Sequence, residues 1–318
     1  MNARIVVSSA GTLHTPALLL RSGFKHAMIG KGLTLHPVLG VAGMQTKDVS
    51  TGLGSGVSMG VVVKQPAISA NTVFKNGTGK VEAGKGQGAQ FEDEEHHPGL
   101  LGLLLPWQCG KQFKIGILSW PNLAVFIGIS RDRSQLHNAV SINSEGQPIV
   151  QYKVTSADTP MLMAGLEASM RMMYAAGSKL IFIGHENFPW FSRSDTESEG
   201  DNAARYDAFI ASAKKEGIKA GKSQVFSAHQ MSSCRMAAHP RDGCTRSTGE
   251  LYECQSLFLA DGSILPTSLG VNPMVTIEAF AHLVARKIVS AVKQGGVYDD
   301  ALKAKVVAAE QGRSRSEW

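Results

Sequence analysis

The sequence predicts a mixed α/β fold, and three of its features support this prediction. Short apolar runs punctuated by glycine or proline, as is typical of strands, occupy residues 35–63 and 113–129. Apolar side chains recur with the spacing of a helix face over residues 156–176 and 273–292. With 318 residues, 43% hydrophobic and 18% charged, the chain is long enough to form two domains with buried cores.

The first elements expected are a strand at residues 4–9 and a short helix after it. Pro16 suits the first turn of that helix, because proline has no backbone N–H to leave unpaired there, so we expect the helix to begin at Thr15. Residues 35–63 are expected to be strands interrupted by glycine. The polar, glycine-rich residues 76–90 are expected to form a mobile loop.

The middle of the chain continues with strand signals. Residues 113–129 are expected to be strand-like, with a break at Pro121. Residues 134–154 are expected to form a β-hairpin about a turn at residues 143–146, where Asn, Ser, Glu and Gly follow one another.

The strongest helix signal of the chain covers residues 156–176. Ser156 and Asp158 are available to cap its N-terminus, and apolar side chains follow at helical spacing. The elements expected after it are a loop at residues 188–205, a helix at 205–216, a strand at 257–260 and an amphipathic helix at 273–292.

Charge and cysteine usage exclude several classes of protein. The formal net charge of +6 comes from scattered lysine and arginine residues without interleaved aromatic residues, so we expect no nucleic-acid partner. The four cysteines form no Cys-x-x-Cys pair, so we expect buried free thiols in a reducing compartment and no metal site. No run approaches the ~20 apolar residues of a membrane span. The first residues lead straight into a strand, which does not suggest a signal peptide.

The glycine-rich patterns of the chain do not predict a phosphate site. Residues 52–56 lie in a strand-like region with no helix after them, so they lack the strand–loop–helix context of a dinucleotide fingerprint. Residues 79–86 end in Gly86, where a phosphate loop would have the Ser or Thr that holds magnesium. Residues 30–32 are interpreted as a turn. The Gly-x-Ser-x-Gly pattern of many hydrolases does not occur.

Three segments in the last quarter of the chain carry side chains suited to alcohol chemistry: His229, then Asp261-Gly262 after a short strand, then Asn272-Pro273 at the start of a helix. A histidine has an ordinary pKa near 6.5, so it can accept a proton at neutral pH. A helix N-terminus offers N–H donors and a positive dipole end that can stabilise an anion, for example a reduced flavin ring. Each residue alone is explained more simply as a structural histidine, a turn and an N-cap. Together they predict a site that removes a proton and a hydride from an alcohol.

These segments resemble the C-terminal signature of the glucose–methanol–choline (GMC) oxidoreductase family. Residues 9–23 resemble the second signature of that family, which runs along the flavin. The similarity is closest to the long-chain fatty alcohol oxidase branch, and it extends over nearly the whole chain apart from residues 76–90 and the tail. The stretches that also carry it are residues 35–38, 105–107, 140–152, 249–254 and 270–274.

The resemblance implies FAD-dependent oxidation of long-chain fatty alcohols to aldehydes, with oxygen as the acceptor and hydrogen peroxide as the product. His229 and Asn272 correspond to the catalytic pair of the family. His229 would act as the base or orient the hydroxyl group, and Asn272 would hold that hydroxyl by a hydrogen bond. Asp261 and Gly262 would contact the ribityl–pyrophosphate arm of FAD. The other cofactor contacts implied are Pro273 and Met274 at the ring end, and Thr15 in the second signature.

The resemblance also implies the domain organisation. Residues 1–35 and 227–295 would belong to a partial, Rossmann-like FAD-binding domain, residues 36–226 would form a substrate-binding domain with an antiparallel β-sheet and helices, and residues 296–318 would be a tail. Apolar side chains that are candidates for lining an alkyl tunnel, although core packing explains them equally well, are those of Leu103, Leu104, Phe126 and Met161.

The sequence departs from the family pattern in three ways. The strand, Gly-x-Gly-x-x-Gly turn and helix that hold the ADP half of FAD have no counterpart here, so we expect the chain to be the C-terminal portion of a longer protein. Ser232 and Ser233 stand where the family usually has a glycine and a small residue. The membrane-anchoring apolar segments of the branch, which would associate an intracellular protein with a membrane, have no counterpart either. Two alternatives remain open: another alcohol or sterol dehydrogenase of the family, and an inactive fragment that binds a partner or a lipid.

Overall fold

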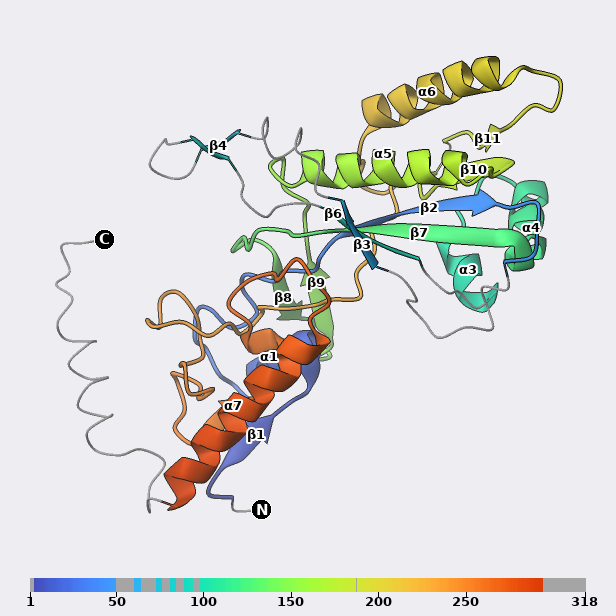
Figure 1. The fold of residues 1–318 in the computed structure, drawn as a ribbon. Coiled ribbons are helices and arrows are strands. Elements are labelled where there is room, and N and C mark those ends of the chain that lie inside the picture. The colour runs from blue at the N-terminus through green and yellow to red at the C-terminus, as the bar shows by residue number, and fades with distance from the viewer. Residues whose placement is uncertain are drawn as a thin grey trace. The chain divides into compact units, whose positions relative to one another are not determined.

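The computed structural model describes residues 3–49, 60–63, 73–75, 81–83, 89–93, 98–186 and 188–293. The chain divides into two compact units, each built from segments that are far apart in the sequence. The first unit comprises Met1–Leu35, Arg133–Lys153 and His229–Trp318, and the second comprises His36–Asp132 and Val154–Ala228. The chain contains both helices and strands (Figure 1), so the predicted mixed α/β fold is confirmed.

The first unit contains two small sheets. β1 (Val6–Ser8) pairs in parallel with β12 (Leu257–Leu259), and both strands were expected from their apolar sequence. β8 (Ala139–Ile142) and β9 (Pro148–Gln151) form an antiparallel hairpin, which confirms the hairpin predicted from the sequence.

The helices of the first unit are α1 (Gly11–Arg21), the short 3-10 helix η2 (Gly262–Ile264) and α7 (Met274–Lys293). α7 agrees with the amphipathic helix expected from the sequence. α1 begins at Gly11 rather than at the expected Thr15, because the N–H of Gly11 is bound by the carboxylate of Asp261. The core of the unit is formed by side chains of α1, β12, η2 and α7, among them Leu19, Leu259, Ile264 and Val284.

The hairpin packs against α1 in the first unit, although residues 133–153 fall within the range 36–226 assigned to a substrate domain. The backbone N–H of Val140 donates to the carbonyl oxygen of Gly30 at 2.8 Å, and Nη1 of Arg21 donates to the carbonyl oxygen of Gly146 at 2.6 Å. Gly30 has a φ of 79°, and a Cβ there would lie 2.0 Å from the carbonyl oxygen of Val140. Residues 30–32 are therefore a turn that lies close to the hairpin, and only a glycine at position 30 allows this close approach.

The second unit is built on a six-stranded sheet in which every neighbouring pair is antiparallel, in the order β11-β10-β2-β7-β6-β3. Its long central strands are β2 (Val38–Met44) and β7 (Leu123–Ser130). The other strands are β3 (Gly60–Val63), β6 (Ala89–Asp93), β10 (Leu180–Ile183) and β11 (Phe191–Ser192), and a separate ladder joins β4 (Val73–Lys75) to β5 (Val81–Ala83).

Helices cover the two faces of this sheet. α5 (Thr159–Ala175) lies along β2 and β7 on one face, and α6 (Glu199–Glu216) packs on α5 (Figure 1). Side chains of α3 (Pro98–Leu104) and α4 (Gly110–Leu118) belong to the apolar cluster on the other face. Successive side chains of a strand point to opposite faces, so β2 and β7 each contribute to both clusters.

The prediction that residues 113–129 are strand-like is wrong in its first half. Residues Gly110–Leu118 are helix α4, which is followed by the 3-10 helix η1 (Trp120–Asn122) and then by β7. α4 packs closely on α3, since a Cβ at Gly116 would lie 2.9 Å from the side chain of Leu105. This tertiary contact selects a helix where the local apolar pattern suits a strand equally well.

Two other boundaries also differ from expectation. α6 begins at Glu199, inside the expected loop 188–205, because Oγ of Ser198 accepts a hydrogen bond at 3.1 Å from the N–H of Asp201 and so caps the helix. Residues 76–90, expected to be a loop, contain β5 and the first residues of β6, and their other residues lie outside the described part of the chain. Residues 52–56 also lie outside it.

Candidate functional site

Asp261 is a buried carboxylate whose two oxygens both accept hydrogen bonds. Oδ2 accepts from the backbone N–H of Gly11 at 3.0 Å and from Oγ1 of Thr15 at 2.5 Å, and Oδ1 accepts from the N–H of Ser263 at 2.8 Å. The carboxylate lies at the N-terminal end of α1, where the helix dipole favours a negative charge. Asp261 therefore joins the end of β12 to α1 and explains why α1 begins at Gly11.

Thr15 is completely buried, and its hydroxyl group is used within the protein. Besides donating to Asp261, Oγ1 of Thr15 accepts from the N–H of Ala10 at 3.1 Å and lies 3.3 Å from Oγ of Ser8. These contacts hold the end of β1, the first turn of α1 and the Asp261 carboxylate together. The predicted contact between Thr15 and a cofactor remains a prediction.

Gly262 lies where three segments of the candidate site meet. Its carbonyl oxygen accepts a hydrogen bond from the N–H of Ser232 at 3.1 Å. A Cβ at position 262 would lie 2.9 Å from Oγ1 of Thr12, 3.1 Å from the carbonyl oxygen of Gln230 and 3.2 Å from Cδ1 of Ile277. Thr12 itself donates to that carbonyl oxygen of Gln230 at 2.7 Å. The position has no room for a side chain, and it connects α1, the segment after His229 and the first turns of α7.

His229 directly precedes Gln230 and is half-buried. Burial lowers the pKa of its imidazole below the ordinary value of 6.5. The ring is therefore neutral at neutral pH and has a nitrogen that can accept a proton. This is the protonation state that a general base requires.

Asn272 and Pro273 lie at the start of α7, as the sequence predicted. Asn272 is exposed and Pro273 is buried, and the carbonyl oxygen of Pro273 accepts from the N–H of Ile277 at 2.8 Å. Met274 and Val275 in the first turn are 68% and 71% exposed. Large apolar side chains are thus exposed at a helix N-terminus, which supplies backbone N–H donors.

Ser232 and Ser233 hold the segment that follows His229. Ser232 has a φ of 75°, in the left-handed region that favours glycine, and its Oγ lies 3.1 Å from Oγ1 of Thr34. Oγ of Ser233 donates to the carbonyl oxygen of Thr12 at 2.6 Å. The conformation at Ser232 therefore suits the glycine that the resembled family usually has at this position. The hydrogen bond between the hydroxyl groups of Ser232 and Thr34 offsets part of the strain.

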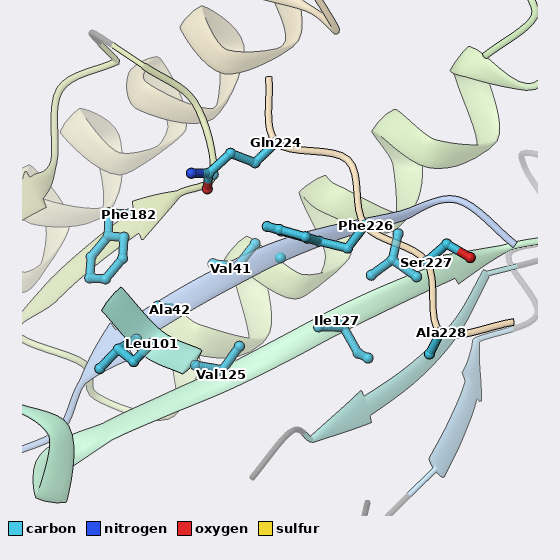
Figure 2. A pocket seen from close by; sticks show the side chains of 13 residues that line it. Val41, Ala42, Leu101, Val125, Ile127, Phe182, Gln224, Phe226, Ser227 and Ala228 are labelled. Atoms are coloured by element: carbon cyan, nitrogen blue, oxygen red, sulfur yellow. The ribbon is translucent and has the colours of Figure 1, made fainter. Parts of the chain in front are cut away.

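A cavity of about 230 Å³ lies in the second unit, on the α3 face of the sheet (Figure 2). Its lining is apolar, and the described residues that form it include no charged side chain. β2 and β7 supply Val38, Gly40, Val41, Ala42, Val125 and Ile127, α3 supplies Leu101, and the remaining lining residues are Phe182, Gly184, Gln224, Phe226, Ser227 and Ala228.

The hollow shape of the cavity follows from small residues on one face of β2. A Cβ at Gly40 would have no atom within 4 Å, whereas a Cβ at Gly43, on the opposite face, would lie 2.5 Å from Oγ of Ser178 and 2.7 Å from Sδ of Met173. The α5 face is therefore filled, and the α3 face is left open at Gly40.

Gln224, Phe226, Ser227 and Ala228 form one wall of the cavity. Phe226 and Val38 exchange two backbone hydrogen bonds, each of 3.0 Å, so Phe226 forms an antiparallel bridge with the first residue of β2. Figure 2 shows Gln224, Phe226 and Ala228 in sequence along this wall. The residue that follows Ala228 in the chain is His229.

The tunnel candidates from the sequence do not line this cavity. Phe126 packs against the core cluster beneath α5, because it alternates with Val125 and Ile127, which face the cavity. Met161 is buried in α5 and does not line the cavity either. Phe126 and Met161 therefore pack in the core, which is the alternative to tunnel lining that the sequence also allowed. The side chains of Leu103 and Leu104 lie outside the described part of the structure.

Several residues of the two candidate sites are not predicted individually from the sequence, including Gly11, Thr12, Gly40, Gln224 and Phe226. Gly40 and Ala42 carried a readable signal, because two small residues on the same face of a strand leave space there. Gln224 and Phe226 had no such signal, since their place at the cavity depends on backbone hydrogen bonds to the distant residues Gly184 and Val38.

The four cysteines of the chain are free thiols. Cys234 and Cys244 are fully buried free thiols, and burial together with the neighbouring Cys244 raises the pKa of the Cys234 thiol. Cys109 is exposed, contrary to the expectation of buried thiols. The described residues include no group of three His, Cys, Asp or Glu side chains that could hold a metal. Within the same residues, no helix combines the length and apolar character needed to cross a membrane.

Comparison with known families matches the GMC oxidoreductase family twice. Its N-terminal part matches residues 1–38, and its C-terminal part matches residues 132–281. The described segments that meet at Gly262 all fall within these two matches.

Curated relatives match over most of the chain. Long-chain-alcohol oxidase FAO4A of Arabidopsis thaliana is 28% identical over 304 residues, which cover 92% of this chain and 38% of the relative. Long-chain-alcohol oxidase FAO4B of the same plant is 32% identical over 300 residues, which cover 92% of this chain and 37% of the relative. The chain thus spans little more than a third of the length of these relatives.

A solved structure of formate oxidase from Aspergillus oryzae has a similar fold. The TM-score is 0.60 with 13% identity, over 94% of this chain and 56% of that chain. At this identity the likeness concerns the fold alone.

Proposed function

The chain belongs to the GMC oxidoreductase family, whose cofactor is FAD, and from this premise we propose that it takes part in the oxidation of long-chain fatty alcohols. The product would be the aldehyde, and oxygen would accept the electrons and form hydrogen peroxide. The names of the curated relatives support this substrate class, since both are long-chain-alcohol oxidases.

The observation that carries the proposal is the cavity of the second unit. An alkyl chain gains free energy when it leaves water for an apolar surface, about 0.8 kcal/mol for each buried CH₂ group. The described lining has no charged side chain, and its wall ends at Ala228, the residue before His229. We propose that the alkyl chain of the alcohol occupies this cavity.

The residues of the first unit fit one end of a flavin. Gly262 has no room for a side chain, so only its backbone is available at this turn, and Met274 exposes an apolar side chain at the N-terminus of α7. We propose that Gly262, Pro273 and Met274 contact FAD, and that Thr15 and Asp261 hold these segments in position through their hydrogen bonds. When bound, FAD supplies the acceptor for the hydride of the alcohol carbon.

The proton of the alcohol would go to His229. Its imidazole is neutral because burial lowers its pKa, so a nitrogen of the ring can accept the hydroxyl proton. Asn272 would hold the same hydroxyl oxygen through its side-chain amide. Residues 1–35 and 227–295 would then form part of the flavin-binding domain, and residues 36–226, apart from the hairpin that packs on α1, the substrate-binding domain. The tail expected at residues 296–318 lies outside the described residues.

The test is the oxidation of decan-1-ol by the full chain loaded with FAD, with hydrogen peroxide as the measured product. We expect His229→Ala to reduce kcat by roughly a hundredfold or more, the contribution typical of a positioned base. The flavin absorbance of the variant should be unchanged. His282→Ala is the matched control, because His282 is exposed on α7.

Two outcomes would contradict the proposal. One is a protein that stays colourless after incubation with FAD, and the other is a His229→Ala variant that produces peroxide at the rate of the His282→Ala control.

A further inference from the structure

Gln224 is a polar side chain in the wall of an otherwise apolar cavity. The backbone N–H of Gln224 donates to the carbonyl oxygen of Gly184 at 2.8 Å, which holds the residue beside the sheet. A Cβ at Gly184 would lie 3.0 Å from Oε1 and 3.2 Å from Cβ of Gln224. The missing side chain at Gly184 thus makes room for the glutamine side chain, which Figure 2 shows near Phe182 and Val41.

The amide oxygen of Gln224 is buried and accepts no hydrogen bond from any residue that the structure describes. A buried polar atom without a partner costs about 1–3 kcal/mol, so such atoms are rare in folded proteins and need an explanation. A leucine or methionine would fill the same wall without this cost. The position of the amide in the lining of the cavity indicates that its partner is a ligand.

The chemistry of the cavity restricts that ligand group. The amide oxygen accepts a hydrogen bond and the amide NH₂ donates one, and a hydroxyl group can do both. A carboxylate or an ammonium group would be buried without a counter-charge, since the described lining has no charged side chain. A neutral hydroxyl group is therefore the partner that fits.

The place of Gln224 along the wall separates this hydroxyl from the reacting one. Gln224 is held beside Gly184 and Phe226 beside Val38 of β2, and Gln224 precedes His229 by five positions in the sequence. We propose that the amide of Gln224 binds a second hydroxyl group, carried on the alkyl chain away from the carbon that is oxidised. Diols are then the preferred substrates. This inference rests on the proposed function, because it assigns the alkyl chain to the same cavity.

The test is equilibrium binding of two probes, decan-1-ol and decane-1,10-diol, to the full chain by titration calorimetry. Binding needs no turnover, so the result is independent of the flavin. We expect the diol to bind the unmodified chain about tenfold more tightly than the monoalcohol. Gln224→Leu should abolish this preference by weakening diol binding, and should leave monoalcohol binding unchanged or stronger. Gln147→Leu, an exposed glutamine in the turn of the hairpin, is the matched control and should keep the preference.

A second variant, Gln224→Met, keeps the experiment decisive if leucine disturbs the fold, because methionine is unbranched and fills irregular space. It should lose the preference in the same way. Equal binding of the two probes to the unmodified chain, or a diol preference that survives both variants, would overturn the inference while monoalcohol binding still supports the proposed function. If neither probe binds, the inference falls and the cavity no longer supports the proposed function.

Discussion

The candidate sites of the two units are formed in different ways, one by buried hydrogen bonds and the other by an apolar cavity. In the first unit the buried carboxylate of Asp261 is satisfied within the protein, because it accepts hydrogen bonds from Gly11, Thr15 and Ser263. In the second unit the cavity is apolar, and its shape follows from missing side chains such as that of Gly40. Hydrogen bonds set the orientation of the groups that they join, whereas missing side chains set the volume of a cavity.

This difference predicts how each site fails. The first site is damaged by the loss of an acceptor, because donors that stay buried lose their partners. The second is damaged by added atoms, because a filled cavity cannot admit a ligand. Substitutions that remove atoms should therefore be most harmful in the first unit, and substitutions that add atoms should abolish binding in the second.

The largest effect is expected for Asp261→Ala. The change removes the partners of two backbone N–H groups and of the Thr15 hydroxyl, and each hydrogen bond to a charged group is worth about 1.5–3 kcal/mol. We expect the free energy of unfolding to fall by about 4 kcal/mol, as measured by urea unfolding followed by circular dichroism. Asp261→Asn should lose less, since its amide oxygen still accepts.

Asp242→Ala is the control for this measurement, because the side chain of Asp242 is 62% exposed. Its effect should stay within about 0.5 kcal/mol. Similar losses for Asp242→Ala and Asp261→Ala would mean that the buried hydrogen bonds do not hold the first unit together.

The next largest effect is expected for substitutions of glycine on the two faces of β2. Gly43→Val places atoms against Ser178 and Met173, and such overpacking should lower the free energy of unfolding by about 2 kcal/mol. Gly40→Val adds the same atoms to open space, so stability should be kept or raised, since valine favours strands. Binding of decan-1-ol should weaken at least tenfold only in Gly40→Val. A Gly40→Val protein that binds decan-1-ol normally would refute the placement of the alkyl chain.

A smaller effect concerns the strain at Ser232. Ser232→Gly and Ser232→Ala both lose the hydroxyl group, so their difference in unfolding free energy reports the backbone alone. We expect the glycine variant to be more stable by about 1 kcal/mol, because φ is 75° there. At the neighbouring Ser233, where φ is not positive, the order should reverse in favour of alanine. The same order at both positions would argue against strain at Ser232.

The smallest effect is a shift in pH dependence. Burial lowers the pKa of His229, and only the neutral imidazole can accept a proton, so activity is present above that pKa and is lost as the pH falls through it. In a profile of kcat/KM against pH for the FAD-loaded protein, we expect the acid limb to have its midpoint below 6.5. A midpoint at or above that value would conflict with His229 as the base. His282→Gln should leave the profile unchanged.

Elements with strong local signals could be predicted from the sequence. α5, α7, the hairpin and β12 were expected because their periodicity, turn residues and apolar runs are visible within a short window. The start of α6 was also readable, since Ser198 stands three residues before Asp201 as an N-cap does, although the prediction missed it. α4 was mistaken for a strand because its apolar pattern is ambiguous until α3 packs against it.

The sequence by itself determined which residue types are available for the proposed chemistry and which residues share a face. It indicated His229, Asp261 and Asn272 as candidates, and the alternation in β2 separates Gly40 and Ala42 from Leu39 and Val41. Only the tertiary structure decided which groups meet. Gly11 and Asp261 are 250 residues apart, and Gln224 is held at the cavity by the hydrogen bond from its N–H to the carbonyl oxygen of Gly184. The physical reason is that periodicity and capping act within a few residues, whereas hydrogen bonds and packing join any segments that the fold brings together.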